Sequence, residues 1–183
     1  GLVVGLLWLE WGPQRGTLWV WLPLALPALP LVIGQYAIAL HLGIDGHYAA
    51  VLWSHLLWVL PWMLLVLQPA WRRIDPRLIL TARTLGWRRT KIFLLLKCPL
   101  LVRPALLAFA TGFSVSMAQY MPTLWLGAGR FATLTTETVA LSSGGSIPIL
   151  ANRALGLLLV TGTVFGLAAL LSRLVGRYRQ GLR

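Results

Sequence analysis

Long apolar segments separated by short charged ones dominate this chain. Four windows contain no Asp, Glu, Lys or Arg, and they are bounded by Arg15 and Asp45, Asp45 and Arg72, Arg103 and Arg130, and Arg153 and Arg173. A helix needs about 20 apolar residues to cross the roughly 30 Å hydrocarbon core of a bilayer. Each window is near or above that length. The pattern therefore predicts membrane-spanning helices over about 17–40, 47–70, 104–122 and 148–172.

A shorter apolar run occupies residues 1–11 and cannot span a membrane. It lacks the basic n-region of a signal peptide. We interpret it as the inner end of an incomplete helix, and the chain as the C-terminal part of a longer protein. The expected fold class is all-α. We predict one polytopic transmembrane domain over residues 1–183, with about five transmembrane helices of which the first is truncated.

The composition agrees with a membrane protein. The chain is 58% hydrophobic and 11% charged, whereas about a quarter of the residues in a soluble domain are charged. The net charge of +12 does not indicate nucleic-acid binding, because the Lys and Arg residues flank apolar segments, over about 71–103 and 173–183. Such residues concentrate on the cytoplasmic side. We therefore expect both clusters, and the C-terminus, to be cytoplasmic.

Two features interrupt the predicted spans. Pro23, Pro27 and Pro30 fall within the first complete span, where each removes a backbone donor; a kinked packing helix and a role in gating both remain open. The segment 123–147, which this topology places outside, contains glycines at both ends. Its middle predicts a short helix over Thr133–Leu141 at the outer interface.

The basic segment 71–103 has its own organisation. Asp75 is a good N-cap residue, because its carboxylate can accept free backbone N–H groups, and Pro76 follows at the first helical position. Leu78, Ala82 and Leu85 have the spacing of one helix face. The segment therefore predicts a short capped helix with an apolar face.

A second short helix is expected after Gly86, which can take a positive φ and close the first helix. The second helix begins at about Trp87 or Arg88, and Ile92, Leu95 and Leu96 supply its apolar face. Periodicity alone favours an amphipathic connector that lies on anionic lipid. The residues themselves favour another interpretation.

The sequence LTARTLGWRRTKIFLLLKCP resembles the cytoplasmic EAA loop in permease subunits of binding-protein-dependent ABC importers. That loop reads E-A-A, three residues, G, nine residues, then I-x-L-P. Its second alanine, glycine, isoleucine and proline fall on Ala82, Gly86, Leu96 and Pro99. Its glutamate, first alanine and leucine are replaced by Leu80, Thr81 and Cys98. Without the glutamate we expect no salt bridge to the ATPase there, although the helix is still expected to dock. The stretch 119–145 is similar to the iron-, thiamine- and sulfate-type branch.

The resemblance implies a permease subunit of the ABC-importer core in a bacterial inner membrane. The implied partners are an ATP-binding cassette subunit, an extracytoplasmic solute-binding protein, and a second permease half or the missing N-terminal half of this one. The residues that the resemblance assigns to ATPase coupling are Asp75, Pro76, Leu78, Leu80, Thr81, Ala82, Leu85, Gly86, Leu96 and Pro99. The other interpretation is a non-transporting membrane scaffold whose basic loop recruits a soluble partner.

No chemistry of its own is indicated for the chain. It lacks the G-x-x-x-x-G-K-[ST] loop that binds ATP phosphates, so any ATP is expected on the partner subunit and no cofactor on this chain. His41, His47 and His55 lack metal-site spacing and are interpreted as interfacial or packing residues, and Cys98 is the only cysteine. We therefore predict no metal site.

Polar groups inside spans are candidates for the solute pathway, because they are costly unless they face water or protein. Ser116, Gln119 and Tyr120 share a face at i, i+3 and i+4 if the span is one helix. Packing through interhelical hydrogen bonds is an equal alternative. Glu137 is either a solvated charge or a contact for the binding protein.

Overall fold

The computed structural model of the protein describes residues 1–13, 18–142 and 147–180. Arg15, which bounds the first apolar window, and Arg183, in the C-terminal basic cluster, lie outside the described residues. All regular structure in the described part is helical. In chain order the elements are α1 (Leu2–Trp11), α2 (Leu18–Ala25), α3 (Ala28–Leu42), α4 (Tyr48–Arg72), α5 (Pro76–Thr84), α6 (Arg89–Ile92), the π-helical turn η1 (Phe93–Lys97), α7 (Cys98–Leu100), α8 (Val102–Met117), α9 (Tyr120–Leu126), α10 (Leu134–Ser142) and α11 (Ile147–Gln180).

The predicted all-α membrane fold is confirmed. Among the described residues, α4 and the stretch Ile147–Val175 of α11 are each long and apolar enough to cross a bilayer. Two further spans are possible if each of two bent helix pairs, α2 with α3 and Arg89–Leu100 with α8, counts as one. The first helix, α1, is apolar but has only 10 residues. The fold thus contains two to four candidate spans.

The span expected over 17–40 is not a single kinked helix. It is divided into α2 and α3, whose axes lie 118° apart. The break falls at Pro27, which has φ −58° and ψ 137°, an extended conformation. Proline cannot donate to a preceding carbonyl and its ring clashes with a continuing helix. Pro30 lies in the first turn of α3, where the missing donor costs nothing.

The span expected over 104–122 also ends early. Helix α8 stops at Met117, and Gln119 (φ −82°, ψ 90°) leads into α9. The expected shared face of Ser116, Gln119 and Tyr120 is therefore wrong, because these residues do not belong to one helix. Pro122 supplies a physical reason. In a continuous helix its ring would clash with the carbonyl of Ala118, whereas in the first turn of α9 its missing N–H needs no partner.

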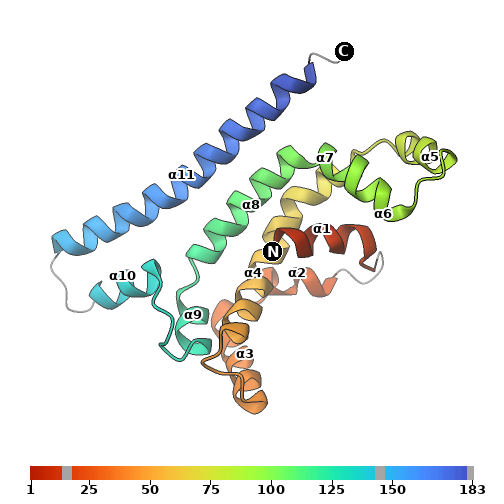
Figure 1. Ribbon diagram of the computed structural model, residues 1–183. Coiled ribbons are helices and arrows are strands. Elements are labelled where there is room, and N and C mark those ends of the chain that lie inside the picture. Colours follow the sequence, from red (N-terminus) through yellow and green to blue (C-terminus); the bar gives the residue numbers. More distant parts are fainter. Residues whose placement is uncertain (14–17, 143–146, 181–183) are drawn as a thin grey trace.

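Helices α4 and α8 form the centre of the molecule (Figure 1). The buried residues of their contact are Val59, Met63, Leu67 and Ala108. Side chains of α4 pack directly onto α8 at Gly112, where an added Cβ would lie 2.7 Å from Met63 Sδ and 3.1 Å from Val59 Cγ1. Helices α1 and α2 pack against α4, and α11 packs against α8. Most of the fold is thus assembled around this one helix pair.

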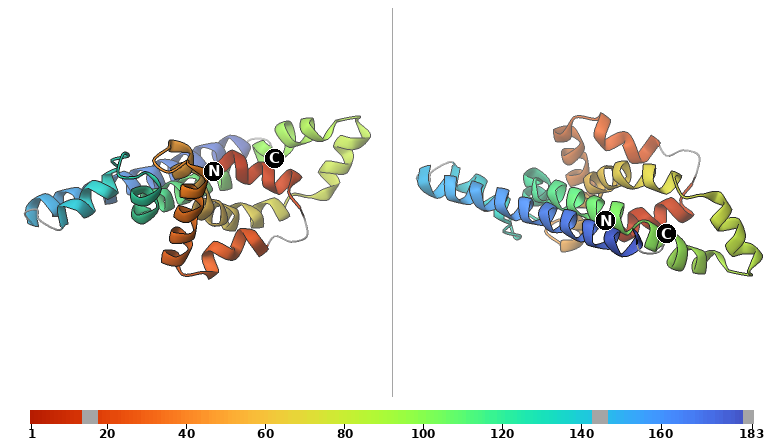
Figure 2. Two further views of the ribbon diagram at one scale, coloured as in Figure 1. Left: turned by 90° about the horizontal axis from the view of Figure 1, so that it is seen from below. Right: turned by 90° about the horizontal axis from the view of Figure 1, so that it is seen from above.

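A second, smaller core lies where α3 and α9 meet the start of α4. It contains Val32, Ala39, Ala50 and Leu126. The turn between α3 and α4 is attached to α9 by a hydrogen bond from Gly46 N to Leu126 O, 2.8 Å long. The two cores lie at different levels along α4, so the molecule is elongated, as Figure 2 shows.

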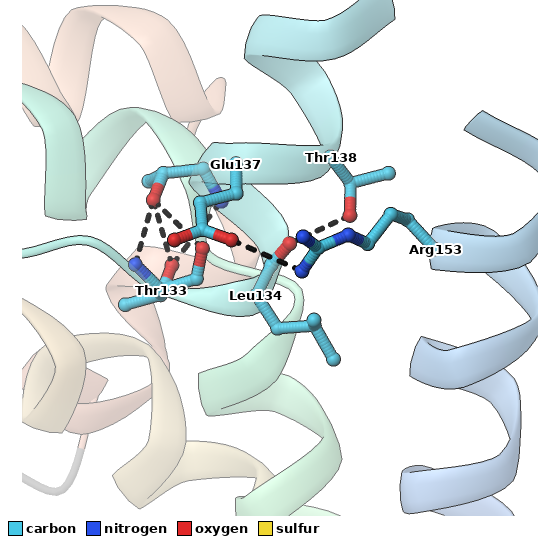
Figure 3. A network of polar contacts seen from close by, with 6 residues as sticks. Thr133, Leu134, Glu137, Thr138 and Arg153 are labelled. Carbon is cyan, nitrogen blue, oxygen red and sulfur yellow. Dashed lines mark hydrogen bonds and ion pairs between the residues drawn. The ribbon is translucent and has the colours of Figure 1, made fainter. Parts of the chain in front are cut away.

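Helix α11 runs along α8 with little of its surface covered, since only 6% of its apolar window is buried. Helix α10 lies beside the N-terminal part of α11. An ion pair of 3.1 Å joins Arg153 Nη1 of α11 to Glu137 Oε2 of α10 (Figure 3). Thr133 and Thr136 cap α10 reciprocally, with N···Oγ1 distances of 2.8 and 3.2 Å. The short helix expected over Thr133–Leu141 is therefore confirmed to within a residue. Gly144 and Gly145, the glycines at the end of this segment, lie outside the described residues.

The close approach at Gly112 generates a prediction about stability. Gly112→Val should lower the melting temperature of the purified protein in detergent, because the added atoms overlap Met63 and Val59. Overpacking of this kind costs about 1–3 kcal/mol.

Gly162→Val is the matched control, since it makes the same change on an exposed face of α11 with no atom within 4 Å of the added Cβ. Equal melting temperatures for the two variants would show that α4 and α8 do not depend on glycine at this point.

Candidate functional site

The segment 71–103 begins with the capped helix that its sequence predicts. Asp75 Oδ1 accepts a hydrogen bond of 2.9 Å from Arg77 N, and Pro76 occupies the first helical position. The hydroxyl groups of Thr81 and Thr84 donate to the carbonyls of Arg77 and Thr81 within the helix. The predicted cap is confirmed, and α5 satisfies its own first turn without outside help.

Gly86 closes α5 with the predicted positive φ, which is +74°. Gly86 N donates to Arg83 O at 2.9 Å, and Trp87 N donates to Ala82 O at 3.1 Å. These two bonds define the Schellman motif, in which glycine is favoured because an L side chain is strained there. No atom lies within 4 Å of an added Cβ. Glycine is therefore favoured here because of the positive φ, and not because a side chain would clash with a neighbour.

Helix α5 follows α4 and precedes α6, projects away from the apolar helices and is exposed on nearly every side (Figure 1). Leu78 is 45% exposed, Leu80 59% and Leu85 68%, whereas Ala82 is 6% exposed. The expected face of Leu78, Ala82 and Leu85 is therefore only partly correct, because Ala82 faces the protein. What the helix presents to its surroundings is leucine side chains among basic residues.

The second half of the segment departs from its expected pattern. Its helix begins at Arg89 with Arg88 as N-cap, close to the predicted start. Ile92 and Phe93 are buried, however, while Leu95 is 59% exposed and Leu96 is half-buried. The reason is η1, in which Cys98 N donates to Phe93 O. A π-helical turn inserts an extra residue and rotates the following side chains.

The loop returns to the membrane domain at Pro99 and Leu101. Leu101 is 2% exposed, and the axis of the preceding helical segment lies 77° from that of α8. A groove of about 520 Å³ lies between the two arms of the loop, lined among others by Ala70, Leu78 and Leu100. The loop is thus bent sharply where it meets α8.

Sequence reasoning missed the partner of this second half, which is Glu10 of α1. Arg89 Nε lies 2.8 Å from Glu10 Oε1, and Lys97 Nζ forms an ion pair with Glu10 Oε2. Arg89 also donates to the Glu10 carbonyl. The Glu10 side chain is 3% exposed. The sequence did contain a signal for this pairing. Glu10 is the one charged residue in the apolar run 1–11, and a carboxylate in such surroundings needs a cationic partner.

Aromatic rings surround these ion pairs. Phe93 lies between Trp11 and Trp71, with ring centroids at 5.0 and 6.4 Å. The Arg89 guanidinium lies 5.6 Å from the Trp11 ring, and Lys97 Nζ lies 4.5 Å from the Trp71 ring. Cations over indole rings gain further stabilisation. Trp11 and Trp71 therefore also hold the second half of the loop against the membrane domain.

A separate polar cluster joins α4 to the break between α8 and α9. Thr123 Oγ1 donates to Gln119 O at 2.6 Å, so it accepts from His55 Nε2 at 2.8 Å. His55 Nδ1 then accepts from Ser116 Oγ, also at 2.8 Å. His55 thus has the packing role predicted for it. The Ser116 hydroxyl is thus used in a hydrogen bond to His55.

Gln119 and Tyr120 share a groove of about 330 Å³ that is also lined by Trp58. Gln119 is 9% exposed, and its Nε2 donates to His55 O over 3.4 Å. Gln119 Oε1 and Trp58 Nε1 are buried and have no hydrogen-bond partner among the described residues. Such groups are costly to bury unpaired, and both belong to residues that line this groove.

The described residues contain no group of three or more His, Cys, Asp or Glu side chains that could hold a metal ion. Neither loop nor groove therefore presents a metal centre in this part of the chain. What the geometry provides is an exposed helix and a mostly apolar, uncharged groove that Gln119 and Tyr120 also line.

Comparison with known proteins supplies one strong similarity. The chain is 67% identical over 182 residues to the inner membrane ABC transporter permease protein YnjC of Escherichia coli strain K12. The match includes 100% of this chain and 36% of YnjC, so the chain spans about a third of that relative's length. No family model and no solved structure matches. Over its whole length, this chain is a close relative of one part of an inner membrane ABC transporter permease.

Proposed function

We propose that this chain is part of the transmembrane permease of an ABC importer in a bacterial inner membrane. The observation that carries the proposal is α5, a capped and exposed helix that projects from apolar helices and ends in a Schellman turn at Gly86. The identity to a protein named as an inner membrane ABC transporter permease supports it. The spacing of Ala82, Gly86, Leu96 and Pro99 resembles the EAA loop of importers, which supports import as the direction of transport.

In this proposal α5 docks into a groove of an ATP-binding cassette subunit. Its exposed leucines, Leu78, Leu80 and Leu85, are suited to fill an apolar groove, and the neighbouring arginines are suited to acidic groups at the groove's rim. Asp75, Pro76 and Thr81 maintain the helix, and Gly86 ends it. ATP is bound and hydrolysed on that partner, and this chain holds no cofactor.

The remaining partners follow from the same proposal. An extracytoplasmic binding protein delivers the solute, and a second permease half, or a further part of the same protein, completes the pathway. The length of the relative is consistent with either arrangement. The loop 71–103 and the C-terminus are cytoplasmic, because basic residues concentrate there.

We further propose that Gln119 and Tyr120 contribute to the solute pathway. The support is the groove that they share with Trp58, where a buried amide oxygen and an indole N–H are without a hydrogen bond. Ser116 contributes by holding His55, and thereby the break between α8 and α9, in place. A solute that passes this groove can satisfy both groups for a short time.

The turn at Gly86 tests the coupling proposal. Gly86→Val should strongly reduce solute uptake while the protein still inserts in the membrane, because a β-branched residue disfavours a φ of +74°. Uptake and ATP hydrolysis are measured in proteoliposomes that contain the assembled transporter.

Gly86→Asn is the control at the same position, since asparagine tolerates positive φ better than other L residues. It should keep more uptake than Gly86→Val. If both variants transport normally at normal expression, the turn does not act in coupling.

Membrane topology provides an independent prediction. With Cys98 replaced by Ser, a cysteine introduced for Arg88 should resist an impermeant thiol reagent in intact cells. A cysteine introduced for Gly129 should react, because the segment between the last two spans is expected outside. Labelling of the first and not the second would reverse the orientation of the loop and exclude docking to a cytoplasmic ATPase.

The groove is tested by Gln119→Leu. This change removes one long hydrogen bond, and interhelical bonds of this kind are worth roughly 0.6 kcal/mol. We therefore expect a small change in melting temperature and a clear change in uptake rate or solute affinity.

Gln35→Leu is the comparison, because Gln35 is also buried and accepts a 3.1 Å bond from Ser54 Oγ but does not line this groove. It should reduce stability and leave uptake per folded molecule unchanged. Lost stability with unchanged transport in Gln119→Leu would assign that residue to packing alone.

A further inference from the structure

Glu10 joins the first helix of the chain to a loop that follows it by almost 80 residues. Three ion pairs occur among the described residues, and two of them belong to this carboxylate. In the third ion pair, between Arg153 and Glu137, both side chains are about half exposed. Glu10 is different because it is 3% exposed and Lys97 is 13% exposed. Removing one member of a buried ion pair leaves an uncompensated charge.

The two cations come from opposite ends of the second half of the loop. Arg89 begins α6 and Lys97 ends η1, so one carboxylate holds the whole of this segment against the end of α1. Arg89 also donates to a carbonyl in the last turn of α1, where a positive charge is favoured by the helix dipole. Charge and backbone contacts therefore act together.

Apolar contacts strengthen the same junction. Phe93 is 6% exposed and contacts the rings of Trp11 and Trp71. On its other side, α1 packs through Leu2, Leu6 and Leu9 against the core formed by α4 and α8. An unbroken series of contacts thus leads from Lys97, through α1, to the centre of the membrane domain.

The first half of the loop contrasts with the second. The described hydrogen bonds made by side chains of α5 and by its cap lie within the helix and its own first turn, and its leucines are exposed. Gly86 separates the two halves, with open space around it. The loop therefore consists of an exposed docking helix and an anchored segment, with a glycine turn between them.

We propose that Glu10 is a positioning residue that fastens residues 89–100 to α1, so that a displacement of α5 is transmitted to the α1–α4–α8 core. The transmission rests on the proposed coupling function, whereas the anchor itself can be measured without it. Glu10 in this proposal has no contact with solute or nucleotide. It determines whether the loop moves with the membrane helices or independently of them.

The anchor is tested by hydrogen exchange of the purified full-length protein in lipid nanodiscs. Glu10→Gln should accelerate exchange in 89–100 by about tenfold or more, which corresponds to the loss of about 1.4 kcal/mol of local stability. Exchange in 76–85 should stay unchanged. The reversed pair Glu10→Lys with Lys97→Glu should restore part of the slow exchange, because it re-forms the buried pair with position 97 but leaves Arg89 beside a lysine.

Two further variants keep the test decisive. Arg89→Gln removes a partner that is 58% exposed, so it tests the anchor even if Glu10→Gln does not fold. Glu137→Gln removes the exposed ion pair on α10 and should leave exchange in 89–100 unchanged. Equal exchange in Glu10→Gln, Arg89→Gln and the unmodified protein would overturn the anchor, and so would an equal acceleration in every helix.

Transmission is tested by the amount of solute imported per ATP hydrolysed in the assembled transporter. Glu10→Gln should lower this ratio while ATP hydrolysis continues, and the reversed pair should raise it again. An unchanged ratio together with a loosened segment would overturn the role in transmission. If the unmodified protein itself shows no ATP-dependent uptake, the coupling function fails, and the exchange measurements still decide whether Glu10 is an anchor.

Discussion

The contact between α4 and α8 is the one on which the other elements depend. Side chains of α4 pack directly onto α8 at Gly112, where Met63 and Val59 occupy the space that a side chain would take. Helices α1, α2 and α11 pack on the outside of this pair, and the loop 71–103 connects its ends. The direction in which α5 projects is therefore set by how α4 and α8 cross. A change at their contact is therefore expected to shift α5, although α5 lies at the far end of the molecule.

Breaks in apolar helices are tolerated here because other parts of the protein satisfy the freed groups. In lipid, an unpaired backbone N–H or C=O is expensive, so irregular backbone survives only where protein or water covers it. At the break between α8 and α9, Thr123 donates to the carbonyl of Gln119, and Gln119 donates to the carbonyl of His55. The polar cluster around His55 therefore stabilises the break and also borders the groove that we propose for solute.

Acidic residues are scarce, and three of the four have identifiable structural partners. Asp75 caps α5, Glu137 pairs with Arg153, and Glu10 pairs with Arg89 and Lys97. The basic residues are far more numerous, with nine Lys and Arg in 71–103 alone. A carboxylate placed among so many cations determines which of them are held against the protein. The others remain available to a partner, and this division is what gives the loop an anchored half and an exposed half.

The sequence by itself determined the apolar segments, the capped helix at Asp75, the turn at Gly86 and the short helix after Thr133. These features depend on interactions between residues close together in the chain, so their residue types are sufficient to predict them. The tertiary structure decided the rest. Proline positions indicated breaks, but only packing set the 118° bend after α2, and the break after Met117 removed the expected face of Ser116, Gln119 and Tyr120. Glu10 and Lys97, which are 87 residues apart, meet only because α1 packs beside the loop. No local pattern encodes that pairing, because it depends on how separate helices come together.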